Sequence, residues 1–233
     1  MKIAVFYSGL IRSYQHIYTS IDKILPNEHV EFYFHTWEEQ KKEKIDFVLN
    51  SRKWKDFIIE KDIKEYRSNY AKGFYSKMKS FSLIRDADFI VYSRFDNYYW
   101  PESKEIKFDN LDPNKFYIIP YCNWHGVEDR FCVGTPNSIH EWASVFELHE
   151  KKVINFDQMQ WGIGEKLTSL NISKYKWEHL DNIKTSIIKG YDENILKSKR
   201  CTPQFDGNEN FRSPNDDYQK YLSVCNLKNG EQQ

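Results

Sequence analysis

Short apolar runs alternate with a stretch of helical spacing in the first half of the chain. Four runs rich in β-branched and aromatic residues predict buried strands, at 3–7, 30–34, 89–92 and 116–119. Between the first two runs, apolar side chains recur at helical spacing over 14–24, and a Pro-Asn pair ends this helix. The order strand, helix, strand favours a mainly parallel sheet with crossover helices.

The remaining pattern predicts further helices and weaker strands. Residues 38–66 are highly charged with small apolar islands, which indicates helix, loop and one edge strand. The positions Phe74, Met78, Phe81 and Ile84 share one face of a helix predicted over 70–85. Two more helices are predicted at 138–149 and 158–170, and two short strands at 130–134 and 172–177.

The length and the fading apolar pattern define the expected domain organisation. A chain of 233 residues corresponds to one domain of good size. We expect residues 1–180 to form this domain. From Asp181 onward the chain grows polar, so we expect 181–233 to be an extension that belongs to the same domain or is partly disordered.

Charge and cysteine usage exclude several classes of protein. Lys plus Arg equals Asp plus Glu, at 34 each, which lacks the basic footprint of a nucleic-acid-binding protein. The four cysteines form no C-x-x-C pair, so a structural zinc site is not expected. No stretch reaches the length of an apolar membrane span, and the basic run 197–200 allows at most a weak contact with an anionic membrane. A reducing cytoplasm with free thiols is the default expectation.

Clusters of candidate binding residues follow three of the predicted strands. They are Ser8, Gly9 and Arg12 after the first, His35 and Trp37 after the second, and Asp96 and Asn97 after the third. Because the carboxyl ends of parallel strands meet at one edge of the sheet, these three clusters should converge on one cleft.

Each of these residue types has a possible role in binding and an ordinary structural alternative. Gly9 allows a close approach of the backbone to a ligand, and the Arg12 guanidinium could bind a diphosphate in a fork, or lie on the surface after a turn. His35 could donate to a ligand and Trp37 could stack on a ring. A buried histidine beside a core tryptophan is equally compatible with the sequence.

Asp96 is the candidate for a metal ligand. A carboxylate at a strand end can hold Mn²⁺ or Mg²⁺, the usual bridge to substrate phosphates, which indicates a metal-assisted nucleotide-sugar site. The alternative is a solvated strand end at which Asp96 caps a turn.

The loop 123–129 contains candidates for a general base. His125, Glu128 and Asp129 qualify by residue type, and the sequence does not rank their geometry. A surface loop in which Asp129 is merely structural is the alternative. The chain has no G-x-G-x-x-G, no G-x-x-x-x-G-K-[ST] and no G-x-S-x-G, which argues against a dinucleotide fingerprint, a P-loop and a hydrolase nucleophile elbow.

Four segments resemble small bacterial and viral glycosyltransferases with a GT-A-like fold, many of which are found among surface-polysaccharide genes. Residues 2–12 are similar to the start K-I-A-V-x-x-S-G-x-x-R, and residues 32–37 to x-x-F-H-T-W. Residues 91–96 are similar to V-x-x-R-x-D, and residues 129–134 to D-x-F-x-x-G. The segments occur in the family's order and span roughly the first 135 residues.

This resemblance implies a single α/β domain of GT-A type and transfer of a sugar from a nucleotide-diphosphate sugar. The implied acceptor is a hydroxyl of a glycan or of a lipid-linked molecule. The implied binding residues for nucleotide, diphosphate and donor pocket are Ser8, Gly9, Arg12, His35 and Trp37. Asp96 takes the place of the metal-binding D-x-D carboxylate, and Asp129 is the first choice for acceptor base or sugar contact.

The chain departs from the family's D-x-D pattern because Arg94 stands two residues before Asp96. Two alternatives follow from this difference. Arg94 could itself neutralise the diphosphate and make the cation less necessary, or Asp96 alone could anchor a metal held mostly by substrate and water. A nucleotidyltransferase, for which the loop 8–12 is poor in glycine, and a non-catalytic binding module are the other function classes considered.

Overall fold

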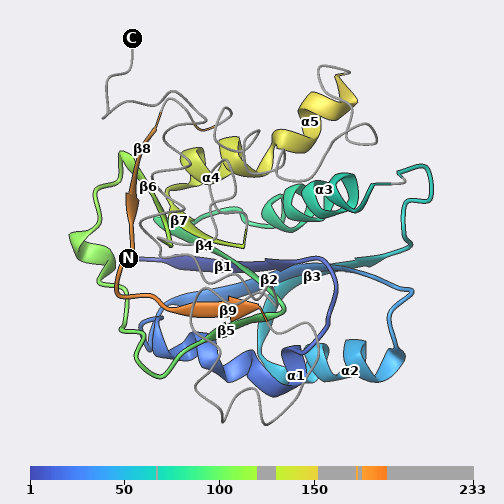
Figure 1. Cartoon of the computed structure of the whole chain (residues 1–233), viewed down its shortest axis with the longest axis horizontal. Coiled ribbons are helices and arrows are strands. Elements are labelled where there is room, and N and C mark those ends of the chain that lie inside the picture. Colours follow the sequence, from blue (N-terminus) through green and yellow to red (C-terminus); the bar gives the residue numbers. More distant parts are fainter. Residues whose placement is uncertain (67, 120–129, 152–171, 173–174, 188–233) are drawn as a thin grey trace, which may run out of the picture.

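A seven-stranded sheet forms the centre of the molecule in the computed structural model, with helices on both of its faces (Figure 1). The structure describes residues 1–66, 68–119, 130–151, 172 and 175–187. The strands of the sheet, in spatial order, are β3 (Trp54–Glu60), β2 (Val30–Trp37), β1 (Ile3–Ser8), β4 (Phe89–Arg94), β7 (Phe131–Gly134), β6 (Lys115–Ile118) and β8 (Lys176–His179). A separate pair joins β5 (Asn97–Tyr99) to β9 (Thr185–Ile187).

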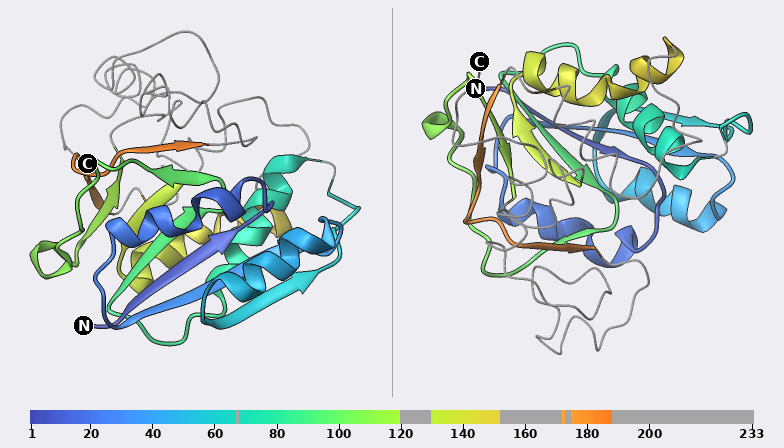
Figure 2. Two further views of the ribbon diagram at one scale, coloured as in Figure 1. Left: turned by 90° about the horizontal axis from the view of Figure 1, so that it is seen from below. Right: turned by 45° about the horizontal axis from the view of Figure 1, so that its top comes forward.

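The helices divide between the two faces of the sheet (Figure 1, Figure 2). One face carries α3 (Asn69–Phe81), α4 (Pro136–Ala143) and α5 (Val145–Glu150). The other carries α1 (Tyr14–Ile17), the 3₁₀ turn η1 (Tyr18–Lys23) and α2 (Lys42–Ser51), and a second 3₁₀ turn, η2 (Phe108–Asn110), precedes β6. This arrangement confirms the predicted α/β domain with a central sheet flanked by helices.

The sheet is mainly parallel, with one strand reversed. The four strands from β3 to β4 pair in parallel, and β8 pairs in parallel with β6. Only β7 runs antiparallel to both of its neighbours, β4 and β6. At the open edge, the pairing of β2 with β3 shifts register between Phe32 and Tyr33, a β-bulge or local irregularity.

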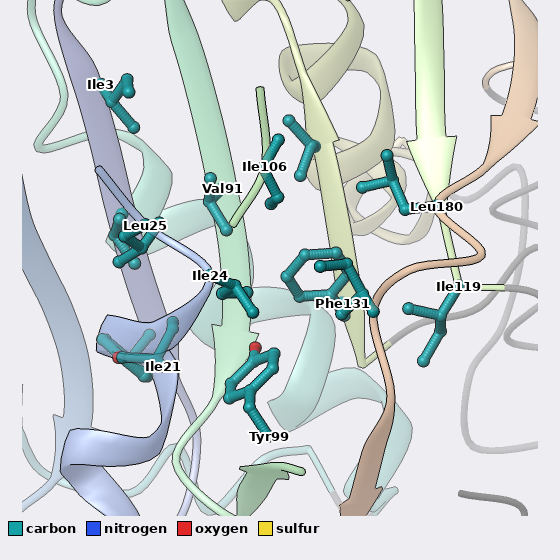
Figure 3. Close-up of a cluster of buried hydrophobic side chains, with 14 of the residues drawn as sticks. Ile3, Ile21, Ile24, Leu25, Val91, Tyr99, Ile106, Ile119, Phe131 and Leu180 are labelled. Atoms are coloured by element: carbon teal, nitrogen blue, oxygen red, sulfur yellow. The ribbon is translucent and has the colours of Figure 1, made fainter. Parts of the chain in front are cut away.

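Side chains alternate between two buried cores because successive residues of a strand point to opposite faces. In β1, Ile3, Val5 and Tyr7 pack in the core beneath α1 and α2, whereas Ala4 and Phe6 pack in the core beneath α4. Figure 3 shows the first core, where Ile21, Val91 and Leu180 approach from distant parts of the sequence. Both faces of β1 are therefore covered, which explains its continuous apolar sequence.

The predicted strands are present, but several predicted elements have different bounds. The helix expected over 14–24 is a single α-turn continued by η1, and the helix expected over 138–149 is divided at Ser144. Within η1, the Ser20 hydroxyl accepts a hydrogen bond from the backbone N–H of Tyr99 at 3.1 Å, a long-range contact that the local pattern does not predict. The edge strand expected at 172–177 is β8, at Lys176–His179.

The pair β5–β9 was not predicted from the sequence. It matches Asn97 with Ile187, so the start of the expected polar extension belongs to the folded domain. The helix predicted at 158–170 and the rest of the extension, from 188 onward, lie outside the described residues.

Gly134 provides a test of the packing between β7 and α4. A Cβ atom at this position would clash with Ser138 Oγ, which donates a hydrogen bond to the Thr135 carbonyl at 3.0 Å and could move aside only by giving up this bond. We expect Gly134→Ala to lower the free energy of unfolding by about 1–3 kcal/mol in urea denaturation, the usual cost of overpacking. In the matched variant Gly73→Ala, the added Cβ meets no atom within 4 Å, so stability should rise by up to about 1 kcal/mol. An unchanged stability of Gly134→Ala would contradict this packing.

Candidate active site

A cavity of about 560 Å³ opens at the carboxyl ends of the parallel strands. This volume lies in the range of sites that bind small molecules and cofactors. The sequence-predicted residues that line it are Ser8, Gly9, Arg12, Trp37, Arg94 and Asp96. The strand ends therefore converge as the sequence predicts.

The strand register explains this convergence. Ser8 at the end of β1 is aligned with His35 on β2 and with Arg94 on β4, so the three form one row across the sheet. β4 ends at Arg94, and Asp96 lies in the short turn between β4 and β5. The row thus brings Arg94 and Asp96 to the cavity beside the loop that follows β1.

Asp96 is held by two arginines. Arg94 forms a fork on the carboxylate, with Nε donating to Oδ1 and Nη2 donating to Oδ2, both at 2.9 Å. Arg12 donates from Nη1 to Oδ2, also at 2.9 Å. The Asp96 side chain is 2% exposed, whereas the side chains of Arg12 and Arg94 are 33% and 27% exposed. The negative charge is buried and the two positive charges face the cavity.

The ion cluster lowers the pKa of Asp96. Burial alone would raise this pKa, but the charges and hydrogen bonds of Arg94, followed by those of Arg12, outweigh burial and favour the carboxylate. One carboxylate beside two guanidinium groups leaves this cluster with a net charge of +1. Such a site attracts an anion, and the forked geometry of arginine suits phosphate oxygens.

The surroundings of Asp96 do not fit a divalent cation. Both carboxylate oxygens already accept hydrogen bonds from guanidinium groups, which would repel a metal ion at the same oxygens. Within the described residues, no group of three or more His, Cys, Asp or Glu side chains could hold a metal. The geometry at Asp96 therefore does not fit the Mn²⁺ or Mg²⁺ site predicted for this carboxylate.

The turn after β1 is fixed by hydrogen bonds from neighbouring elements. Gly9 has a φ of 95°, a left-handed conformation that side-chain-bearing residues rarely adopt. Its backbone N–H donates to Ser76 Oγ at 2.8 Å, and its carbonyl accepts a hydrogen bond from Thr36 Oγ1 at 2.8 Å. Lys44 donates to the carbonyl of Arg12 at 2.7 Å. These contacts from β2, α2 and α3 hold the backbone that carries Arg12.

His35 supports this turn through Ser76 and is not among the described residues that line the cavity. It is fully buried, with Nδ1 2.7 Å from Ser76 Oγ and Nε2 2.8 Å from Glu60 Oε1. Because Ser76 Oγ accepts the Gly9 N–H, its own hydrogen is free to point to Nδ1, and the Nε2 hydrogen then points to Glu60. His35 is therefore placed as the structural alternative describes, as a buried histidine packed beside Trp37. In this position both of its ring nitrogens are occupied by protein groups.

Trp37 lies at the cavity wall but is only 5% exposed. Its ring stacks on Tyr75 with a centroid distance of 5.7 Å and an angle of 19°, and it packs edge-on against His35 at 4.7 Å. The faces of the indole are thus used in packing. Trp37 therefore forms part of the cavity wall. The sequence predicts that a ligand ring stacks on this indole, and such stacking would require the contacts with Tyr75 or His35 to separate.

The structure adds cavity residues that the sequence reasoning missed. Lys77 of α3 is 4% exposed, and its ammonium group lies 4.6 Å from the Trp142 ring centroid and 4.7 Å from that of Phe74. The position of Lys77 on the apolar face of the predicted helix is the feature of the sequence that could have identified it. Asp62 and Lys72 also line the cavity.

The candidates for a general base lie outside the described residues. They are Asp129, His125 and Glu128, and the role predicted for Asp129 stays a prediction.

Comparison with known proteins finds similarity in structure only. No family model and no curated protein matches the chain. Two crystal structures of the glycosyltransferase GlyE from Streptococcus pneumoniae TIGR4, one of them in the apo form, are 12% identical, with TM-scores of 0.48 and 0.47. They cover 97% of this chain, which spans 62% of the GlyE chain. A structure of an active-site mutant of LgtC is 11% identical with a TM-score of 0.46, covering 76% of this chain and 72% of its own.

The buried histidine predicts a specific pH dependence of stability. Burial is the largest influence on His35 and lowers its pKa below the ordinary value of 6.5, although Glu60 acts in the opposite direction. As the pH falls, His35 therefore takes up a proton more readily in the unfolded chain than in the folded one. The contribution of neutral, buried His35 to the free energy of unfolding is present above pH 6.5 and declines below it. Between pH 7.5 and 5.5, we expect urea unfolding to show a smaller loss of stability for His35→Gln than for the wild type.

The exposed His29 supplies the control for this experiment. His29→Asn should retain the wild-type loss of stability over the same pH interval, because the side chain at this position is 73% exposed. An identical pH dependence of the wild type and His35→Gln would show that His35 is not the group responsible.

Proposed function

We propose that this protein is a glycosyltransferase. It would move a sugar from a nucleotide-diphosphate sugar to a hydroxyl of a glycan or of a lipid-linked acceptor. The observation that carries this proposal is the pair of guanidinium groups of Arg12 and Arg94, oriented by the buried Asp96 toward a cavity at the strand ends. A diphosphate is the anion that such a pair fits best.

The proposed chemistry places the reacting diphosphate against these arginines. As the bond between the anomeric carbon and the diphosphate oxygen breaks, negative charge develops on the leaving group. Cations that are already held in position stabilise this charge without reorganising. The acceptor oxygen forms the new bond to the anomeric carbon, and its proton passes to a base. Asp129 stays our candidate for that base or for a contact to the sugar.

The other predicted residues take supporting roles in this proposal. Ser8 and Gly9 would line the nucleotide beside the arginines, and the Ser8 hydroxyl is hydrogen-bonded to Tyr92 at 3.0 Å. Asp96 would act as a positioning residue for Arg12 and Arg94. Since its surroundings do not fit a divalent ion, we assign the neutralisation of the diphosphate to the arginines and no step to a metal.

We place this activity in the cytoplasm, where nucleotide sugars and free thiols would both be expected. Cys132, on β7, is buried as a free thiol. Among the described helices, none has the length and apolar character needed to cross a bilayer. A lipid-linked acceptor would then be reached from the membrane surface.

Removal of Arg12 tests the proposed anion site. We expect Arg12→Ala to weaken binding of inorganic pyrophosphate and of nucleoside diphosphates by roughly 10- to 100-fold in isothermal titration calorimetry, the effect of losing a charged hydrogen bond. Arg85→Ala, which changes an exposed arginine away from the cavity, should bind like the wild type. Binding by the wild type should be the same in EDTA and in Mn²⁺. A requirement for Mn²⁺ would contradict the assignment to arginine.

A turnover assay separates the transferase from the other classes of function. Release of nucleoside diphosphate from a nucleotide sugar, dependent on an acceptor with a free hydroxyl, is the expected result. Formation of pyrophosphate from a nucleoside triphosphate and a sugar phosphate would instead identify a nucleotidyltransferase. Binding of glycan without any turnover would identify a non-catalytic module.

A further inference from the structure

The end of the cavity opposite the arginines carries a different set of charges. Asp62 follows β3, Lys72 lies on α3 and Glu39 follows β2, and all three line the cavity. Two carboxylates and one ammonium give this end a net charge of −1, against +1 around Asp96. A phosphorylated ligand should therefore place its phosphates at Arg12 and Arg94 and its uncharged part at Asp62.

The distance between the two ends suits a nucleotide. Three strand-to-strand steps separate β4 from β3. At about 4.8 Å for each step, the ends of β4 and β3, which carry Arg94 and lead to Asp62, lie roughly 14 Å apart. An extended nucleoside diphosphate spans a separation of this order between its terminal phosphate and the far edge of its base. The Asp62 end is then the place of the base, an assignment that rests on the proposed function.

The carboxylate of Asp62 has an unused hydrogen-bonding capacity. Its Oδ2 pairs with the ammonium of Lys72, and its Oδ1 is buried with no hydrogen-bond partner. Each carboxylate oxygen has two acceptor sites, so Oδ2 can accept a second hydrogen bond, from a ligand N–H, beside the one from Lys72. The Asp62 side chain is 30% exposed, which allows this contact.

Neighbouring groups extend Asp62 into a row of one donor and two acceptors. The Lys72 ammonium donates to Asp62, and the backbone N–H of Asp62 donates to both oxygens of Glu39, at 2.9 and 3.0 Å. Lys72, Asp62 and Glu39 thus offer a donor, an acceptor and a second acceptor in that order. A base that fits this row must present an acceptor, then a donor, then another donor.

Guanine is the common base with this pattern, because its edge presents the O6 carbonyl, the N1 hydrogen and the N2 amine. Uracil has a carbonyl in the third place, which would face the Glu39 carboxylate. Cytosine and adenine have an acceptor nitrogen in the second place, opposite Asp62. We infer that the cavity selects a guanine nucleoside diphosphate, with Lys72 at O6, Asp62 at N1 and Glu39 at N2.

Calorimetric titration of the full chain with GDP, UDP, ADP, CDP and inorganic pyrophosphate tests this inference. We expect the wild type to bind GDP at least about tenfold more tightly than the other three nucleotides. In Asp62→Asn, one acceptor oxygen becomes a donor, so GDP binding should weaken by a similar factor. Pyrophosphate binding should stay unchanged, since it depends on the arginines. Asp109→Asn, at an exposed position away from the cavity, is the matched control.

Inosine diphosphate isolates the contact with Glu39, because hypoxanthine keeps O6 and the N1 hydrogen of guanine but lacks the N2 amine. The wild type should bind GDP more tightly than inosine diphosphate, and Glu39→Ala should remove this difference. Lys72→Met should weaken GDP and inosine diphosphate equally. These variants keep the inference testable if Asp62→Asn does not fold.

The outcomes separate the inference from the proposed function. If pyrophosphate binds and depends on Arg12, but the four nucleotides bind equally or Asp62→Asn retains GDP, the guanine site is wrong and the diphosphate site stands. If pyrophosphate and all four nucleotides fail to bind the folded wild type, both are overturned. Selective GDP binding that is lost in Asp62→Asn supports both.

Discussion

The buried carboxylate of Asp96 is the constraint on which the cavity depends. A carboxylate with 2% exposure is stable only if cations and hydrogen bonds replace its hydration. Arg94, from the same strand end, and Arg12, from the turn 84 residues earlier, supply these interactions. Asp96 thereby ties the end of β4 to the loop after β1. The same requirement gives the arginines their orientation, since each must direct its guanidinium to one carboxylate at the cavity edge.

The backbone of the turn after β1 depends on a second buried polar network. Glu60, His35 and Ser76 form a chain of hydrogen bonds that begins on β3, passes through β2 and ends on α3. Its last member accepts the N–H of Gly9, which also donates to the His35 carbonyl on β2 at 3.2 Å. In a buried network of this kind each member is satisfied by the next, so a change at one position is transmitted to the turn.

The sequence predicts the parts of this structure that depend on local pattern. Apolar runs identify the strands, and the rule that parallel strand ends converge brings Ser8, Arg12 and Asp96 to one cavity. Comparison with a D-x-D pattern, however, predicts that Asp96 is a metal ligand. It does not predict that Arg94 donates hydrogen bonds to the Asp96 carboxylate.

Features that depend on long-range contacts could not be predicted from the sequence in the same way. Ser76 appears as an ordinary helix residue until α3 is placed over β1 and β2, where its hydroxyl meets Gly9 and His35. The pairing of Asn97 with Ile187 joins residues whose local sequences carry no common signal. Burial of His35 likewise follows from the packing of α3, because its sequence position at a strand end is equally compatible with exposure to a ligand.

The shift in register between β2 and β3 has a consequence for the behaviour of the chain at high concentration. β3 is an edge strand in the described sheet, and an open, flat edge can recruit a strand of another molecule. The irregular pairing after Phe32 interrupts the regular ladder, and the exposed charges of Lys55 and Asp56 lie on the outer strand. Both features oppose edge-to-edge association, so the strand that leads to Asp62 also carries the sheet's protection against aggregation.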